Sequence, residues 1–176
     1  MTSYRIVITE LYCKLLGEEL KKILNEREML QNQIGYETTE GEVELLSETT
    51  VGQILKGKRN ISFNASLAFQ TSLDYKNPRE LFFSSKKFEL LLIKNIITTI
   101  LINPVFKDTL LKQILAKNFS NISHKEVSQF IEKNKEIFLC SLSNFISDFP
   151  SEETSHQIAE KLTDWLSELA CLISQI

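Results

Sequence analysis

The segment from Leu46 to Phe83 constrains the fold most, because helix start and stop signals follow each other there with few residues between them. Ser47 is a predicted N-cap, whose hydroxyl can accept a hydrogen bond from a free amide of the first turn. Gly57 suits the C′ position, where the backbone turns left-handed. Three residues between them have the i, i+3, i+4 spacing of one apolar helix face: Val51, Ile54 and Leu55. These signals predict a short helix over residues 48–56.

Further helix signals lie on both sides of this short helix. Asn64 is a predicted N-cap, and Asn77 followed by Pro78 suits the start of another short helix over residues 79–83. The inner side of the helix after Asn64 is expected to be apolar: Leu67, Leu73 and either Phe69 or Ala68. Near the N-terminus, residues 7–28 are predicted to form a long amphipathic helix with this apolar face: Ile8, Leu11, Leu15, Leu16, Leu20, Ile23 and Leu24.

The connection between the long first helix and residues 48–56 is acidic and carries little helix signal. Residues 30–36 can form one or two further turns, which are expected to stop near Gly35. Residues 37–44 contain four glutamates around a central glycine, and this composition predicts a loop. A short hairpin is the alternative for the same residues.

The second half of the chain is predicted to be a set of longer, more apolar helices. The polar run from Ser84 to Lys87 is the predicted boundary between a domain of residues 1–85 and one of residues 86–176. With only 5 glycines and 3 prolines, the chain has few turn residues, which favours long helices. Four are expected, over residues 88–102, 105–118, 124–149 and 152–176. The predicted fold class is therefore all-α, with a five-helix N-terminal domain followed by a four-helix C-terminal bundle.

The last predicted helix contains a regular apolar seam. Its members step by 4, 3, 4, 3 and 4 residues: Ile158, Leu162, Trp165, Leu169, Leu172 and Ile176. This is the two-position heptad spacing of helices that pack along their length. The seam can be covered inside one chain or across a dimer, and we expect it to be a dimer interface.

Composition and motifs exclude several classes of protein. The chain has no phosphate-binding glycine loop, nucleophile elbow or paired histidines on a helix, so we expect neither an enzyme nor a cofactor. Three widely spaced cysteines predict buried thiols, and with His124 and His156 they give no zinc spacing: Cys13, Cys140 and Cys171. The N-terminus lacks a signal-peptide pattern, and polar residues interrupt the most apolar run, residues 90–106. We therefore expect a soluble cytoplasmic protein without membrane contact.

One group of residues has the spacing of a known DNA-binding motif. Its members run from the predicted N-cap to the basic turn: Ser47, Thr50, Val51, Ile54, Gly57, Lys58 and Arg59. A second group continues the pattern: Ser62, Leu67, Leu73, Tyr75, Pro78, Leu81 and Phe82. Residues 11–83 thus resemble a lambda-repressor-like (Cro/repressor-type) helix-turn-helix domain. Residues 29–34 are similar to the start of that family's second helix, and residues 37–44 depart from it as an insertion.

The resemblance implies that the protein binds double-stranded DNA as a transcriptional regulator. Residues 48–56 would be the recognition helix, with Thr49, Thr50, Gln53 and Lys56 at base edges or nearby phosphates. Gln31, and at the helix exit Lys58, Arg59 and Asn60, would hold phosphates and set the register without reading sequence. A two-fold operator would require a homodimer, formed by residues 86–176.

Two alternatives remain open at this point. The formal net charge is −3, and the glutamates of residues 37–48 oppose a phosphate backbone. They favour a protein-interaction module, such as a phage or mobile-element inhibitor that retains the scaffold without using DNA. The C-terminal half also leaves room for a small-molecule or peptide ligand near five aromatic residues, although we expect these to be core: Phe130, Phe138, Phe145, Phe149 and Trp165.

Overall fold

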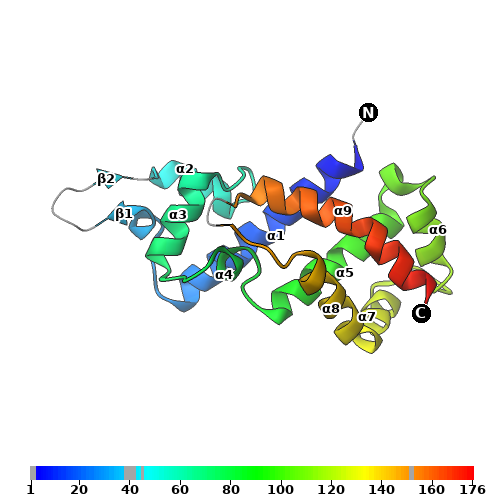
Figure 1. The fold of residues 1–176 in the computed structure, drawn as a ribbon. Coiled ribbons are helices and arrows are strands. Elements are labelled where there is room, and N and C mark those ends of the chain that lie inside the picture. Colours follow the sequence, from blue (N-terminus) through cyan, green and yellow to red (C-terminus); the bar gives the residue numbers. More distant parts are fainter. Residues whose placement is uncertain (1–2, 38–42, 45, 151–152) are drawn as a thin grey trace.

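The computed structural model describes residues 3–37, 43–44, 46–150 and 153–176, and within them the fold is all-α except for one pair of two-residue strands (Figure 1). The first half contains α1 (Tyr4–Glu26), a 3-10 turn η1 (Gln31–Gln33), β1 (Tyr36–Glu37), β2 (Val43–Glu44), α2 (Glu48–Leu55), α3 (Phe63–Ser72) and α4 (Pro78–Phe82). The second half contains α5 (Lys86–Ile102), a 3-10 turn η2 (Pro104–Phe106), α6 (Leu110–Ala116), α7 (His124–Lys133), α8 (Lys135–Phe145) and α9 (Ser155–Ser174).

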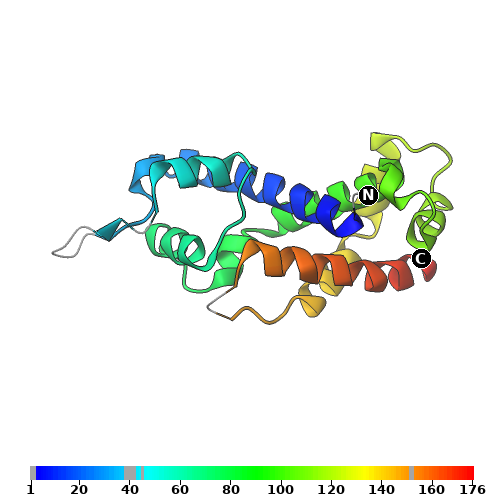
Figure 2. The same ribbon diagram turned by 90° about the horizontal axis from the view of Figure 1, so that it is seen from above.

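The molecule is elongated, and the antiparallel pair α1 and α9 runs along it (Figure 2). Cys13 lies beside Ser155 at the start of α9, whereas Arg5 lies beside Asp164 further along it. The C-terminal half of α1 extends beyond the start of α9, and α2 packs against it. As a result, α2, α3 and the strand pair occupy one end of the molecule, and α6 and α7 occupy the other.

A single apolar core runs through both halves of the chain. It includes the inner face of α1, the apolar face of α5 and most of α9. The buried Tyr12 hydroxyl donates to the Phe82 carbonyl (3.0 Å), and the α9 backbone is bonded to the loop before α3. The predicted boundary at residues 84–87 therefore lies at a turn between helices that share one core.

The heptad seam of α9 is covered inside one chain. Four of its six residues are completely buried: Ile158, Leu162, Trp165 and Leu169. Leu172 is half-buried, and Ile176 is exposed at the end of the chain. Helices α1, α6 and α8 supply the covering surface. In the structure the seam is therefore covered within one chain, because the long apolar face of α1 runs alongside α9.

Several predicted elements differ from the observed ones at polar residues. Residues 124–149 contain two helices, α7 and α8, which are separated at the buried Asn134 (φ −112°, ψ 15°), and α8 ends at Phe145. Residues 105–118 divide into η2 and α6, which Thr109 caps. The second half thus has five described α-helices, where four were expected.

The first half also differs from expectation in detail. Ser62, two residues before Asn64, is the N-cap of α3, and Leu67 faces solvent at 46% exposure while Ala68 and Phe69 are buried. Residues 29–34 form only one 3-10 turn. After this turn, the Gly35 amide donates to the Ser72 hydroxyl of α3 (3.1 Å) and not to a carbonyl of a continuing helix. Tyr36–Glu37 and Val43–Glu44 pair as antiparallel strands, the hairpin alternative.

The end of α1 provides a prediction on stability. Glu28 occupies the left-handed C′ position (φ 55°), where a Cβ atom is costly, and two hydrogen bonds close the cap around it. Glu28→Gly is expected to raise the free energy of unfolding by about 1 kcal/mol in urea denaturation. Asp74→Gly at the equivalent position of α3 (φ 52°) should raise the free energy of unfolding by less, because aspartate tolerates this conformation better than glutamate. A destabilised Glu28→Gly protein would contradict this account.

Candidate nucleic-acid interface

Helix α2 presents a polar side to solvent at one end of the molecule. Val51, Ile54 and Leu55 are buried as predicted, and the Ser47 hydroxyl accepts from the Thr50 amide (3.2 Å) at the N-terminus. Three side chains on the opposite side are exposed and spaced i, i+4, i+7, which places them in one stripe: Thr49, Gln53 and Lys56. We call this stripe the α2 face.

Two glycines hold α2 directly against the backbone of α1. A Cβ atom on Gly17 would lie 2.6 Å from the Ile54 carbonyl oxygen, and one on Gly57 would lie 2.6 Å from the Lys14 Cα atom. Gly57 also has a positive φ of 67°, and the amides of Gly57 and Lys58 bond back to α2. The exit from α2 is therefore rigidly positioned on α1.

The residues after α2 form a basic loop that hydrogen bonds to α9 hold in place. Lys58, Arg59 and Asn60 are exposed, and the Arg59 guanidinium lies 3.4 Å from the Thr50 hydroxyl. The next residue, Ile61, is buried and makes two hydrogen bonds with Ser155: its amide donates to the Ser155 hydroxyl (2.7 Å), and its carbonyl accepts from the Ser155 amide (3.1 Å). The start of α9 thus holds the end of this basic loop in place.

A cysteine supports the same loop from α1. The buried Cys13 thiol donates to the side-chain oxygen of Asn60 (3.0 Å) and lies 3.9 Å from the Ser155 hydroxyl. Burial raises the pKa of Cys13, although its hydrogen bond to Ser155 acts in the opposite direction. Burial also raises the pKa of the neighbouring Tyr12 well above its usual value. The thiol is therefore a protonated donor, and Asn60 has one side-chain atom already engaged.

Most of the predicted DNA-contacting residues come together at this end of the molecule. Gln31 of η1 lies beside α2, with its side-chain oxygen 3.2 Å from the position of a Cβ atom on Gly52. Thr50 is half-buried between Ser47 and Arg59, so it is turned away from the α2 face. The remaining predicted residues are exposed: Gln31, Thr49, Gln53, Lys56, Lys58, Arg59 and Asn60.

Sequence reasoning did not identify Lys14 as part of this surface. Its backbone touches the Gly57 turn and its side chain is exposed, which adds a cation beside the basic loop. Lys14 lies 43 residues before Gly57, so no local pattern could have associated the two. The central part of the acidic insertion, residues 38–42, lies outside the described residues, whereas Glu48 is exposed in the first turn of α2.

The other candidate groups lie apart from this surface. Cys140 and Cys171 are exposed, so the prediction of three buried thiols is right only for Cys13. The imidazole of His156 lies 3.6 Å from Glu160 on the surface of α9, and His124 begins α7. Among the described residues, no three metal-binding side chains gather, and no helix combines the length and apolar character of a membrane span.

The aromatic residues of the C-terminal half form packing contacts. Trp165 and Phe138 are fully buried, and the Trp165 indole donates to the Ser141 hydroxyl (3.0 Å). Phe130 packs against Phe119 and Phe138, with ring centroids 5.2 and 5.8 Å away. Phe149 packs edge-on against Phe83 (5.7 Å), and Phe145 is 44% exposed. These aromatic residues are spread over several packing contacts.

Comparisons of the chain with protein-family models, with curated proteins and with solved structures give no match.

Proposed function

We propose that this protein binds double-stranded DNA with the α2 face and regulates transcription. The observation that carries the proposal is the exposed stripe of Thr49, Gln53 and Lys56, which sits on a rigid support and has cations at its exit. Glutamine can bond adenine at two positions and lysine suits guanine, so this stripe has base-reading chemistry. Lys58, Arg59 and Lys14 would neutralise phosphates beside it.

In this proposal residues 1–85 act as the helix-turn-helix-type DNA-binding half, and residues 86–176 act as its support and pairing half. A dimer would place two α2 helices in successive major grooves, about 34 Å apart. Because most of the α9 seam is buried within one chain, the dimer would have to use a different surface. The two hydrogen bonds between Ile61 and Ser155 would couple the position of the basic loop to that of α9.

The alternative proposal is a protein-interaction module that does not use DNA. Its support is the single 3-10 turn at residues 31–33, where the repressor-type motif has a full helix across the phosphate backbone. The net charge of −3 and the exposed Glu48 point the same way. Selection from a random duplex pool separates the two proposals, because only the DNA reader enriches a sequence.

Two substitutions test the α2 face. With a selected duplex, Gln53→Ala is expected to weaken binding by about 1–3 kcal/mol and to relax the preference at one base pair. Arg59→Ala should weaken selected and unrelated duplexes alike and should reduce the salt dependence of binding, because it would remove a phosphate contact. Fluorescence anisotropy at several salt concentrations measures both effects.

Lys117→Ala is the matched control for these variants, because Lys117 is exposed directly after α6 at the opposite end of the molecule. It should leave the affinity and the salt slope unchanged. If the selection enriches no sequence and the full-length chain has no salt-dependent affinity for DNA, the DNA proposal fails and the protein-partner alternative stands.

A further inference from the structure

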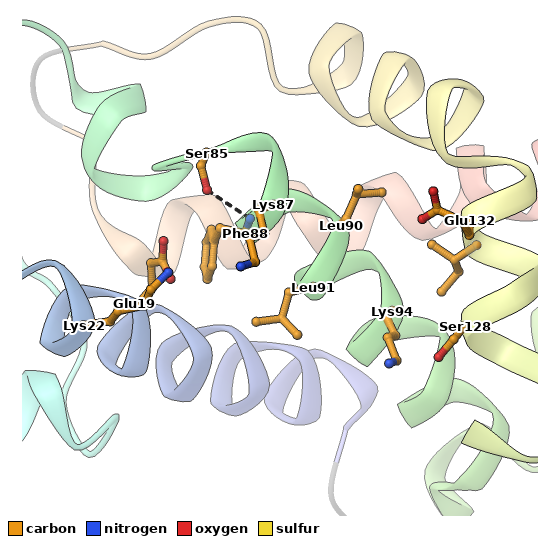
Figure 3. A pocket seen from close by; sticks show the side chains of 11 residues that line it. Glu19, Lys22, Ser85, Lys87, Phe88, Leu90, Leu91, Lys94, Ser128 and Glu132 are labelled. Carbon is orange, nitrogen blue, oxygen red and sulfur yellow. Dashed lines mark hydrogen bonds between the residues drawn. The ribbon is translucent and has the colours of Figure 1, made fainter. Parts of the chain in front are cut away.

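A groove outside the DNA-binding surface lies where α1, α5 and α7 meet (Figure 3). Its volume is about 390 Å³, within the range of small-molecule sites. Phe88 and Ile131 form a nearly buried floor, at 2% and 4% exposure, and Leu91 is 44% exposed at its centre. The groove therefore presents apolar surface to solvent in a concave shape.

The charges around this groove are not balanced within the chain. Of its two carboxylates, Glu132 pairs with Lys135 (2.5 Å), whereas Glu19 accepts from the neutral Ser84 hydroxyl (2.6 Å) and keeps its charge. Lys22 is paired with Glu26 at 3.7 Å. Among the ion pairs of the described residues, none involves Lys87 or Lys94. Lys87 and Lys94 thus border the apolar floor without an ion-pair partner, and together with Lys22 they outnumber the two carboxylates of the groove.

These two lysines lie on one side of α5 and are seven residues apart, with Leu91 between them. Seven residues of α-helix rise about 10 Å, so the two side chains start about two turns apart. In the view of Figure 3, Leu91 lies between Lys87 and Lys94, and Glu132 and Ser128 of α7 lie beyond Lys94. The arrangement is cation, apolar surface, cation along one line.

We propose that this groove binds an elongated small molecule with an apolar body and a carboxylate at each end. The body would lie on Phe88, Leu91 and Ile131, and the two carboxylates would pair with Lys87 and Lys94. The reason is charge complementarity: such a ligand neutralises both unpaired ammonium groups while it covers apolar surface that is otherwise in water. This site is separate from the α2 face, and the inference does not rest on DNA binding.

A second groove provides the contrast within the same molecule. It lies between the start of α1, α6 and α9, and it is lined mainly by apolar residues with no lysine or arginine: Tyr4, Phe106, Leu110, Leu111, Leu166 and Ala170 among them. A ligand bound by apolar contact alone would have no reason to prefer the α1–α5–α7 groove. A doubly charged ligand would, because of these two grooves it is the α1–α5–α7 groove that offers lysines.

The test is an NMR titration of the full-length chain with decanedioate, using decanoate and decanol as probes with one and no charge. Decanedioate is expected to bind with a Kd of about 1 mM or tighter and to shift the methyl signals of Leu91 and Ile131. Decanoate should bind about three- to fivefold more weakly, and decanol more weakly again.

Variants locate the charges. Lys87→Gln and Lys94→Gln should each weaken decanedioate binding about three- to fivefold, to the level of decanoate. Two control variants should leave decanedioate binding unchanged: Lys117→Gln, outside both grooves, and Leu110→Gln, in the second groove. Thermal unfolding curves confirm that each variant is folded. The proposal is overturned if decanedioate does not bind, if decanoate binds equally well, if the shifted signals are those of the second groove, or if Lys117→Gln matches the Lys87→Gln effect.

Discussion

Replacing Arg79 by alanine is expected to lower the free energy of unfolding by about 3 kcal/mol, because it leaves a buried carboxylate without a partner. The Arg79 guanidinium lies 2.7 Å from Glu89, whose side chain is 8% exposed. It also donates to the Ile146 carbonyl at 3.1 Å. The substitution therefore removes the counter-charge of Glu89 and a bond to the end of α8.

Packing adds to this effect. The guanidinium lies over the rings of Phe83 and Phe149, 5.5 Å from each centroid. Arg79 thus connects α4, the start of α5 and the segment before α9 at a point where the two halves of the chain meet. Because the group is partly shielded from water, salt should weaken the interaction less than it weakens an exposed pair.

Urea denaturation with linear extrapolation measures the loss, and the thermal midpoint should fall by about 6–12 °C. Arg5→Ala is the matched control, since its pair with Asp164 is 3.7 Å long and more than half exposed on both sides; it should cost less than about 0.5 kcal/mol. Adding Glu89→Gln to Arg79→Ala should recover part of the loss, because it removes the buried charge. If Arg79→Ala is no worse than Arg5→Ala, the ion pair does not stabilise the fold.

Gly17→Ala is expected to cost about 2–3 kcal/mol and to displace the candidate DNA-reading helix. A Cβ atom at this position would meet two backbone oxygens of α2, at 2.6 Å from Ile54 and 2.9 Å from Leu55. Backbone atoms cannot move aside as a flexible side chain can, so α2 and α1 must separate. Because the cap at Gly57 rests on the same contact, the position of the basic loop should change as well.

Gly52→Ala is the matched control on the other side of α2. Its Cβ atom would approach only the end of the Gln31 side chain, at 3.2 Å, and alanine favours the helix by about 0.5–1 kcal/mol. The control should therefore be neutral or stabilising. Urea denaturation measures both variants, and an HSQC spectrum reports the displacement of α2. An unchanged Gly17→Ala protein would show that the helices are not in backbone contact.

Several local features were predictable because they depend on neighbouring residues. The Ser47 cap, the apolar stripe of α2 and the left-handed Gly57 all follow from chemistry within one turn, and the structure confirms them. The break at Asn134 was missed because apolar periodicity does not register a change of backbone angles at one residue, here φ −112° and ψ 15°. The cap at Ser62 was assigned to Asn64, because both residues can cap and only the backbone decides between them.

By itself, the sequence determined the all-helical class, the amphipathic first helix, the short capped α2 and the polar residues that α2 exposes, because these follow from spacing and capping along the chain. Only the tertiary structure decided that α9 covers its seam against α1, that Ser155 and Cys13 hold the basic loop, and that Gly17 seats α2. The physical reason is that an apolar stripe specifies burial but not its partner, and the choice of partner depends on contacts between residues far apart in the chain.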